Sequence, residues 1–247
     1  MEAVIAKRKK SEKIHIQERD VAIFEFLNRV GYASVEQLAQ FIEGSDSEKA
    51  QGVMLRRLYL LRRFEYIKVF HTHLGNYYAL TSKSKLSNQL ISGVKFDQLP
   101  HHNFLISLFY VVRGCEVLTE REVLAKYKVI GQKGKIPDMI INGWIIEYER
   151  TNKSVVDCKA VLDYWTIDKN KRMCIIYEDD EIRNRYQRLI VNSSKVLLLS
   201  RRDYQSILNV LNNREFATPP APSSVPSAHT PVGVSHGLDN DLANKYR

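Results

Sequence analysis

Apolar residues in the first third of the chain recur at helical spacing and predict three helices. The first begins at Glu18 and is ended by Gly31. The second follows Ser34, with Gln37 at the capping-box position, and the third runs from about residue 45 to residue 63. Their expected core faces are Val21, Phe24, Leu27 and Val30, then Leu38, Phe41 and Ile42, and finally Met54, Leu58 and Leu61.

Two strand-like segments follow the third helix, at residues 66–72 and 77–81, and residues 73–76 join them. Three helices that end in a small hairpin are typical of a winged helix-turn-helix. We therefore predict a winged-helix domain over residues 18–85. The charged segment before it, residues 1–17, is predicted to be a flexible basic arm.

A second domain is predicted between residues 100 and 216, after a connector at 86–99. Its expected elements are a helix at 101–113, strands at 115–119 and 126–130, a hairpin at 139–146, a helix at 154–166, a strand at 173–177, a helix at 182–191, a strand at 195–199 and a helix at 203–211. Five of the seven prolines lie between Pro219 and Pro231, so residues 217–247 are predicted to be a disordered Pro/Ser-rich tail. The expected fold class is α+β.

The hairpin of the second domain carries the candidate chemistry. Two short apolar runs flank Asn142-Gly143, a strong signal for a tight turn. Asp138 precedes the first run, and Glu147 and Glu149 close the second, where side chains two residues apart share a face. Converging carboxylates repel one another unless a cation neutralises them, and oxygen ligands suit Mg²⁺ or Mn²⁺. Lys153 would return a positive charge to the same place.

These residues resemble the signature of the PD-(D/E)XK nucleases, in which Pro-Asp precedes a hairpin that ends in acid-x-(acid or lysine). The match is Pro137-Asp138 followed by Glu147-Tyr148-Glu149. It departs from the usual pattern because Glu149 occupies the position of the family lysine, and Lys153 is the candidate replacement. The Glu-x-Glu-Arg-Thr-x-Lys run is similar to replication-relaxation proteins and to the MobC-type relaxases of mobilisable plasmids.

The resemblance implies a restriction-endonuclease-like α/β fold for residues 100–216 and metal-dependent nicking of DNA. It implies that Asp138, Glu147 and Glu149 bind Mg²⁺ or Mn²⁺, with Lys153 acting on the water or the phosphate. A histidine stands near the start of the corresponding helix in replication-relaxation relatives, which makes His102 a further catalytic candidate. The alternative is that the acids only keep an exposed hairpin soluble.

Charge favours a polyanionic partner. The chain carries 37 Lys and Arg against 28 Asp and Glu residues, a net charge of +9. Residues 49–85 contain eight Lys or Arg residues and one acid, Glu65, whereas a merely solvated face usually mixes signs. The last of the three helices is where major-groove contacts are expected. We predict that double-stranded DNA is bound by Lys49, Arg56, Arg57, Arg62, Arg63, His73 and Asn76.

The sequence lacks the patterns expected for disulfide or zinc sites, for a membrane span and for a tyrosine nucleophile. Cys115, Cys158 and Cys174 are widely spaced and form no Cys-x-x-Cys pair, which favours a reducing, cytoplasmic location over a disulfide framework or a zinc site. No apolar run is long enough to span a membrane, so membrane insertion is not expected. No His-apolar-His cluster accompanies the tyrosines, which disfavours a tyrosine nucleophile.

Three functions remain open at this point. The first is a metal-dependent relaxase that binds and nicks a plasmid transfer origin, with accessory mobilisation or coupling proteins as partners. The second is a non-catalytic winged-helix regulator, or a plasmid replication or relaxation protein, whose nuclease domain has decayed. The third is an accessory protein that only bends origin DNA. Nicking of supercoiled plasmid in the presence of Mg²⁺ or Mn²⁺ discriminates among them.

Overall fold

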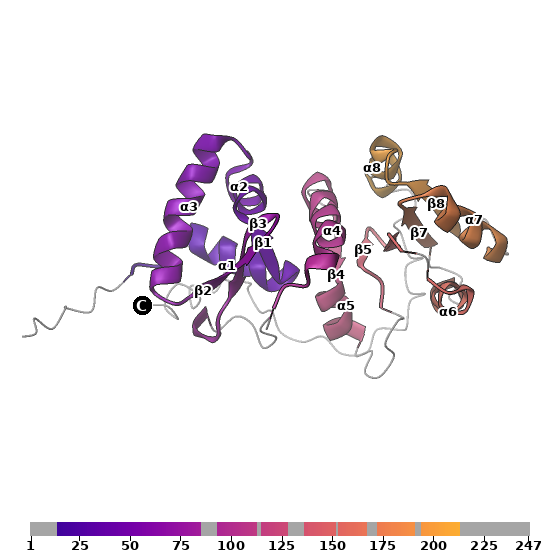
Figure 1. Ribbon diagram of the computed structural model, residues 1–247, viewed down its shortest axis with the longest axis horizontal. Helices are drawn as coiled ribbons and strands as arrows, with labels where there is room; N and C mark the ends of the chain where they lie inside the picture. The colour runs from indigo at the N-terminus through magenta and orange to yellow at the C-terminus, as the bar shows by residue number, and fades with distance from the viewer. Residues whose placement is uncertain are drawn as a thin grey trace, which may run out of the picture. The chain divides into compact units, whose positions relative to one another are not determined.

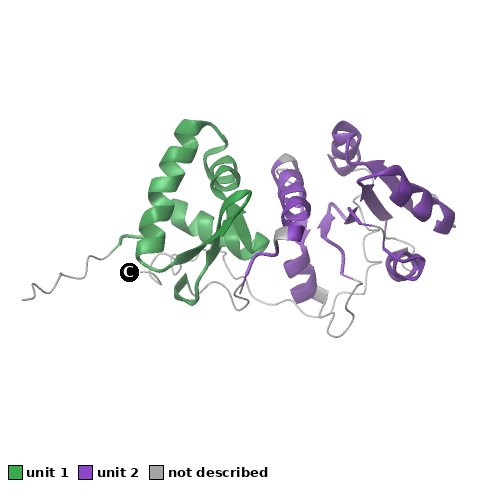
Figure 2. Cartoon of the chain, viewed as in Figure 1, with its two compact units in different colours: residues 1–92, 231–247 green, residues 93–230 purple. Residues whose placement is uncertain are grey.

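The computed structural model is a mixed α+β protein with two sheets (Figure 1). It describes residues 14–84, 93–112, 115–127, 136–151, 153–166, 172–190 and 194–212. The chain divides into two compact units between Ser92 and Gly93, within the predicted connector (Figure 2). The predicted tail 217–247, residues 1–13 of the predicted arm and residues 86–92 of the connector lie outside the described residues.

The first unit places three helices against a small antiparallel sheet. Its elements are α1 (Glu18–Val30), β1 (Tyr32–Ser34), α2 (Val35–Glu43), α3 (Glu48–Arg63), β2 (Ile67–Thr72) and β3 (Gly75–Leu80), and the strand order is β1-β3-β2. The three predicted helices and two predicted strands are present. Strand β1 was not predicted, because three residues are too short to show an alternating pattern. The predicted four-residue connection shrinks to His73 and Leu74, because Gly75 already pairs with Thr72.

Local capping explains where these helices start. Ser34 Oγ accepts from Gln37 N at 3.3 Å while Ser34 N donates to Gln37 Oε1 at 2.9 Å, as the sequence predicted. Ser47 Oγ caps α3 by accepting from Ala50 N. Helix α1 ends at Gly31, whose φ of 91° is easily adopted only by glycine. The core behind the helices includes Met54, Leu58 and Leu61, all 0% exposed, as predicted.

A buried ion pair joins α1 to α3 and corrects two expectations. Arg57 Nε lies 2.6 Å from Asp20 Oδ1, its Nη2 contacts Asp20 Oδ2, and Asp20 is 0% exposed. Arg57 was expected to contact DNA, but its position on α3 turns it toward α1. Nη2 also donates to His15 O at 2.8 Å. The end of the predicted flexible arm is therefore bound to the domain.

The second unit is built on one mixed five-stranded sheet. Its elements are α4 (Leu99–Val111), β4 (Val117–Thr119), α5 (Glu120–Tyr127), β5 (Met139–Ile141), β6 (Trp144–Glu149), α6 (Val155–Thr166), β7 (Arg172–Tyr177), α7 (Asp180–Leu189), β8 (Val196–Ser200) and α8 (Tyr204–Asn212). The sheet order is β4-β5-β6-β7-β8. Pairing is antiparallel from β4 to β6 and parallel from β6 to β8.

One predicted strand of this unit is wrong. Residues 126 and 127 end helix α5, and residues 128–130 lie outside the described residues. The helix begins at a capping box in which Thr119 N donates to Glu122 Oε2 at 2.9 Å and Glu122 N donates to Thr119 Oγ1 at 3.4 Å. That local signal was present in the sequence and outweighs the strand-like composition of the segment.

The predicted hairpin between β5 and β6 is present. Asn142 and Gly143 have φ values of 48° and 80°, as a tight turn of type I′ requires. Asn142 is buried, and its side chain accepts from Glu116 N at 3.2 Å and donates to Leu211 O at 2.8 Å. The turn is thus anchored to α8, and β6 becomes a central strand whose six residues are all buried.

Candidate active site and nucleic-acid interface

The hairpin brings Asp138 beside the two glutamates of β6. Met139 is the first residue of β5 and pairs with Ile146, so Asp138, directly before the strand, lies next to Glu147 on β6. Glu147 and Glu149 share one face of β6 and are 6% and 1% exposed. Burial at this level is unusual for carboxylates and requires a partner for each charge. The acids are therefore not the solubilising edge of an exposed hairpin.

Lys153 supplies that partner. Its Nζ lies 3.0 Å from Glu147 Oε1 and 2.7 Å from Glu149 Oε1, and the side chain is about one third exposed. Burial opposes the charged form of the amine, but the two carboxylates outweigh it and raise the pKa of Lys153 above its usual value. The lysine four residues beyond Glu149 thus reaches the site, although β6 has ended by then.

Glu147 is the most perturbed acid of this group. Burial, followed by repulsion from Asp138 and Glu149, raises the pKa of Glu147 to about 8, against a lowering effect of Lys153. Its second oxygen, Oε2, is buried and has no hydrogen-bond partner among the described residues. A buried carboxylate oxygen without a donor is the position at which a cation or a water would be most strongly held.

The buried carboxylate of Glu149, unlike that of Glu147, has a partner on α7 as well as Lys153. Tyr186, on α7, donates from Oη to Glu149 Oε1 at 2.6 Å, and Lys153 Nζ contacts the same oxygen. Cys158, on α6, packs nearby and is buried. Arg185 on α7 donates to the backbone oxygen of Lys153 and so ties the start of the α6 segment to α7. Tyr186 was not expected from the sequence, where no signal links α7 to the hairpin.

Asp138 is held from the other side by α4. Its Oδ2 accepts from Tyr148 N at 2.8 Å and contacts His101 Nε2 at 3.1 Å. His101 Nε2 also lies 3.2 Å from Tyr148 O, and two acceptors around one ring nitrogen require that Nε2 carries the proton. Burial lowers the pKa of His101, but the hydrogen bond to Asp138, the negative charge of Asp138 and the contact with Tyr148 O together outweigh it, so the pKa is raised.

The histidine hydrogen-bonded to Asp138 is therefore His101, one residue before the predicted His102. Adjacent residues of a helix point about 100° apart, and His101 is the one whose ring lies against Asp138 and Tyr148. The His101 ring stacks on that of Tyr148, with centroids 5.2 Å apart and an interplanar angle of 17°. The dipeptide was recognisable in the sequence, but the rotation of α4 was not.

The predicted metal-ligand set fits this geometry in part. Within the described ranges, no three His, Cys, Asp or Glu side chains lie close enough together to hold a metal ion. Asp138 and Glu147 are neighbours, and the unpartnered Glu147 Oε2 suits a cation. Glu149 fits less well, because Lys153 and Tyr186 already occupy its Oε1. Asp138 and Glu147 thus fit a divalent cation better than Glu149 does.

The exposed face of α3 carries most of the predicted DNA contacts. Lys49, Arg56, Arg62 and Arg63 are exposed, while Arg57 is not. His73 and Asn76 are exposed at the β2–β3 hairpin, where His71 Nδ1 lies 2.8 Å from Asn76 Oδ1. Four positively charged side chains on one face of the helix form a surface that attracts polyanions.

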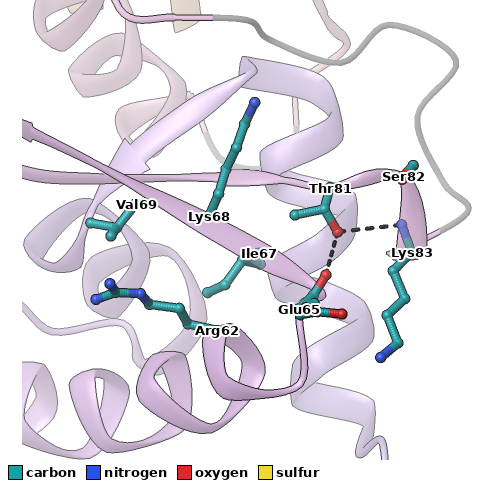
Figure 3. A pocket seen from close by; sticks show the side chains of 8 residues that line it. All are labelled: Arg62, Glu65, Ile67, Lys68, Val69, Thr81, Ser82 and Lys83. Atoms are coloured by element: carbon teal, nitrogen blue, oxygen red, sulfur yellow. Dashed lines mark hydrogen bonds between the residues drawn. The ribbon is translucent and has the colours of Figure 1, made fainter.

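A shallow basic groove adjoins the end of α3 (Figure 3). Its volume is about 530 Å³, and it is lined by Arg62, Glu65, Ile67, Lys68, Val69, Thr81, Ser82 and Lys83. Thr81 Oγ1 donates to Glu65 O and accepts from Lys83 N at 3.3 Å, which ties the wall after β3 to the end of α3. Three cations against one carboxylate make the groove suitable for a phosphate backbone.

No family model matches the chain, and neither curated proteins nor solved structures show a significant match to it. No helix in the described part of the chain is long and apolar enough to cross a membrane.

Proposed function

We propose that the chain is a divalent-metal-dependent endonuclease that binds double-stranded DNA and nicks it. The observation that carries the proposal is the convergence of Asp138, Glu147 and Lys153 at one hairpin. Lys153 reaches the two glutamates although the lysine of the motif is missing from its usual position. A buried acid whose pKa is strongly raised, beside a specific charge partner and a hydrogen-bonded histidine, has the physical character of a catalytic site.

The order of elements supports the two proposed folds. The first unit runs α1-β1-α2-α3-β2-β3, which suits a winged helix with α3 as the DNA-contacting helix. The second unit begins with helix α4 and carries its acids on an antiparallel hairpin within a mixed sheet. That arrangement suits a PD-(D/E)XK nuclease core.

The chemistry is divided between the groups around the hairpin. A bound Mg²⁺ or Mn²⁺ would polarise the scissile phosphate and lower the pKa of a coordinated water. Asp138 and Glu147 would hold that ion, and the His101 hydrogen bond would keep Asp138 in place. Lys153 would stabilise the negative charge that develops on the phosphate. Glu149 would position Lys153 rather than bind the ion directly.

The substrate follows from charge and from the resemblance. The net charge of +9 and the basic face of α3 favour DNA. The similarity to MobC-type relaxases points to a plasmid transfer origin, with mobilisation or coupling proteins as further partners.

A non-catalytic regulator is the second candidate, and one observation favours it. Lys153 Nζ contacts one oxygen of each glutamate and so occupies carboxylate oxygens that a metal would use, as expected of a nuclease-like domain that has kept its fold and lost its activity. DNA binding through the first unit would then be the whole function.

Incubation of supercoiled plasmid with the protein and Mg²⁺ or Mn²⁺ tests the proposal. Open circles are expected with the wild type and not with Asp138→Asn or Glu147→Gln, whereas DNA affinity stays unchanged or rises, because a negative charge is lost. Asp163→Asn is the matched control, since Asp163 is exposed on α6 and pairs with Lys159. Absence of nicking with every metal, together with tight duplex binding, would establish the regulator instead.

A further inference from the structure

The exposed face of α3 is not uniformly polar. Leu55 is 48% exposed and Tyr59 is 65% exposed, and both rank among the most exposed large apolar residues in the described part of the chain. They lie four residues apart and therefore one above the other on the helix. Nothing in the fold of the first unit requires apolar side chains at these two positions, because the core contacts of α3 are made by Met54, Leu58 and Leu61.

The cations of α3 surround this apolar pair. On a helical projection, Lys49, Arg56 and Arg63 lie on one side of Tyr59, and Arg62 lies on the other side of Leu55. All four are exposed. The partner of this face must therefore be negatively charged at its edges and offer apolar groups at its centre. The major groove of duplex DNA has this character, because phosphates border it and thymine methyl groups project into it.

A glycine on the same face adds an independent observation. Gly52 precedes Leu55 by three residues and Tyr59 by seven, so it shares their side of α3. A glycine inside a helix is less favourable than alanine. A Cβ at position 52 would meet no atom within 4 Å, so the packing of the domain does not require glycine there. A partner that approaches the helix backbone closely would require it.

We propose that Gly52, Leu55 and Tyr59 form the surface of α3 that contacts base edges, with the two apolar side chains against thymine methyl groups and Gly52 allowing close approach. This inference rests on the proposed binding of DNA, and it adds how the sequence of the DNA is distinguished. The surrounding arginines and Lys49 contact phosphates and contribute affinity without sequence preference.

The test begins with selection of duplexes bound by the full-length protein from a randomised pool, in chelator to prevent cleavage. Each thymine of the selected site is then replaced by uracil, which removes only the methyl group. Affinity is expected to fall about fourfold per contacted methyl group, the factor that corresponds to burial of one methylene-sized group. In Leu55→Ala or Tyr59→Ala the same replacement should have no effect at the position that the missing side chain contacts.

Two further variants complete the design. Arg62→Ala should weaken binding to thymine and uracil duplexes by the same factor. Gly52→Leu should keep or raise the melting temperature, because a Cβ at position 52 meets no atom within 4 Å and leucine favours the helix more than glycine does, but it should reduce DNA affinity by roughly tenfold or more.

Each contrary result has a distinct meaning. Equal affinity for thymine and uracil duplexes, a uracil effect that persists in both alanine variants, or full affinity of Gly52→Leu would overturn the inference while leaving DNA binding intact. Failure to enrich any duplex would overturn the proposed DNA binding and this inference together. Self-association that is lost in Tyr59→Ala would assign the face to a second copy of the chain.

Discussion

Tyr186 donates a hydrogen bond of 2.6 Å to Glu149, and this contact joins α7 to the central strand β6 at the candidate active site. The accepting oxygen is the one that lies 2.7 Å from Lys153 Nζ. Tyr186, 37 residues after Glu149, thus holds the carboxylate of Glu149, and this carboxylate in turn holds the amine of Lys153. The candidate site therefore depends on packing across α6, α7 and β6, not only on the hairpin that carries its acids.

Tyr186→Phe should destabilise the protein by about 1–3 kcal/mol, because it leaves a buried carboxylate with one fewer donor. The free energy of unfolding from urea denaturation measures the loss. Nicking should also slow, since Lys153 is then held less firmly. Tyr59→Phe is the matched control and should change stability by less than about 0.5 kcal/mol, because that side chain is exposed. Equal losses of unfolding free energy in the two variants would contradict the role of the Tyr186 hydrogen bond.

Stability in chelator should fall as the pH rises from about 4.5 to about 8. The pKa of Glu147 is raised to about 8 in the folded protein from an ordinary value of 4.5. Between these values the folded state holds a proton that the unfolded state has released, so the free energy of unfolding decreases with pH. Urea denaturation at several pH values measures the slope. Glu147→Gln should flatten it, whereas Asp163→Asn should leave it unchanged.

Arg57→Ala should destabilise the first unit by about 3–5 kcal/mol, because it leaves Asp20 buried without its partner. Arg56→Ala, on the next residue of α3, should leave stability within about 0.5 kcal/mol and lower DNA affinity instead. Thermal or chemical denaturation and duplex titration measure the two effects. A weaker DNA affinity in folded Arg57→Ala, without loss of stability, would return Arg57 to the DNA-contacting surface.

Replacement of both Lys68 and Lys83 by alanine should reduce the salt dependence of DNA binding. If the groove beside α3 holds the phosphate backbone, the slope of log K against log salt should fall by up to ~0.9 for each lost phosphate contact. Titrations at several salt concentrations measure the slope. Arg19→Ala removes a cation that pairs with Glu43 in the same unit, and it should have a smaller effect. Equal slopes for all three proteins would exclude the groove from the interface.

Local signals in the sequence were sufficient for much of the fold. Ser34 with Gln37 predicts the start of α2, and Asn142-Gly143 predicts the hairpin between β5 and β6, because each pattern is satisfied by backbone groups within a few residues. The same locality places Asp138, Glu147 and Glu149 near one another. Strand alternation and a tight turn are enough to bring them together.

Tertiary structure decided which charged residues face inward and which histidine reaches the site. Arg57 lies among exposed arginines in the sequence, yet its rotation on α3 pairs it with Asp20. His101, one residue before the predicted His102, contacts Asp138, because the orientation of α4 over the sheet is set by long-range packing. Tyr186 reaches Glu149 for the same reason. Turns and helix caps are determined by residues a few positions apart. The rotation of a helix about its axis, which decides which side chains face inward, is determined by the whole core against which the helix packs.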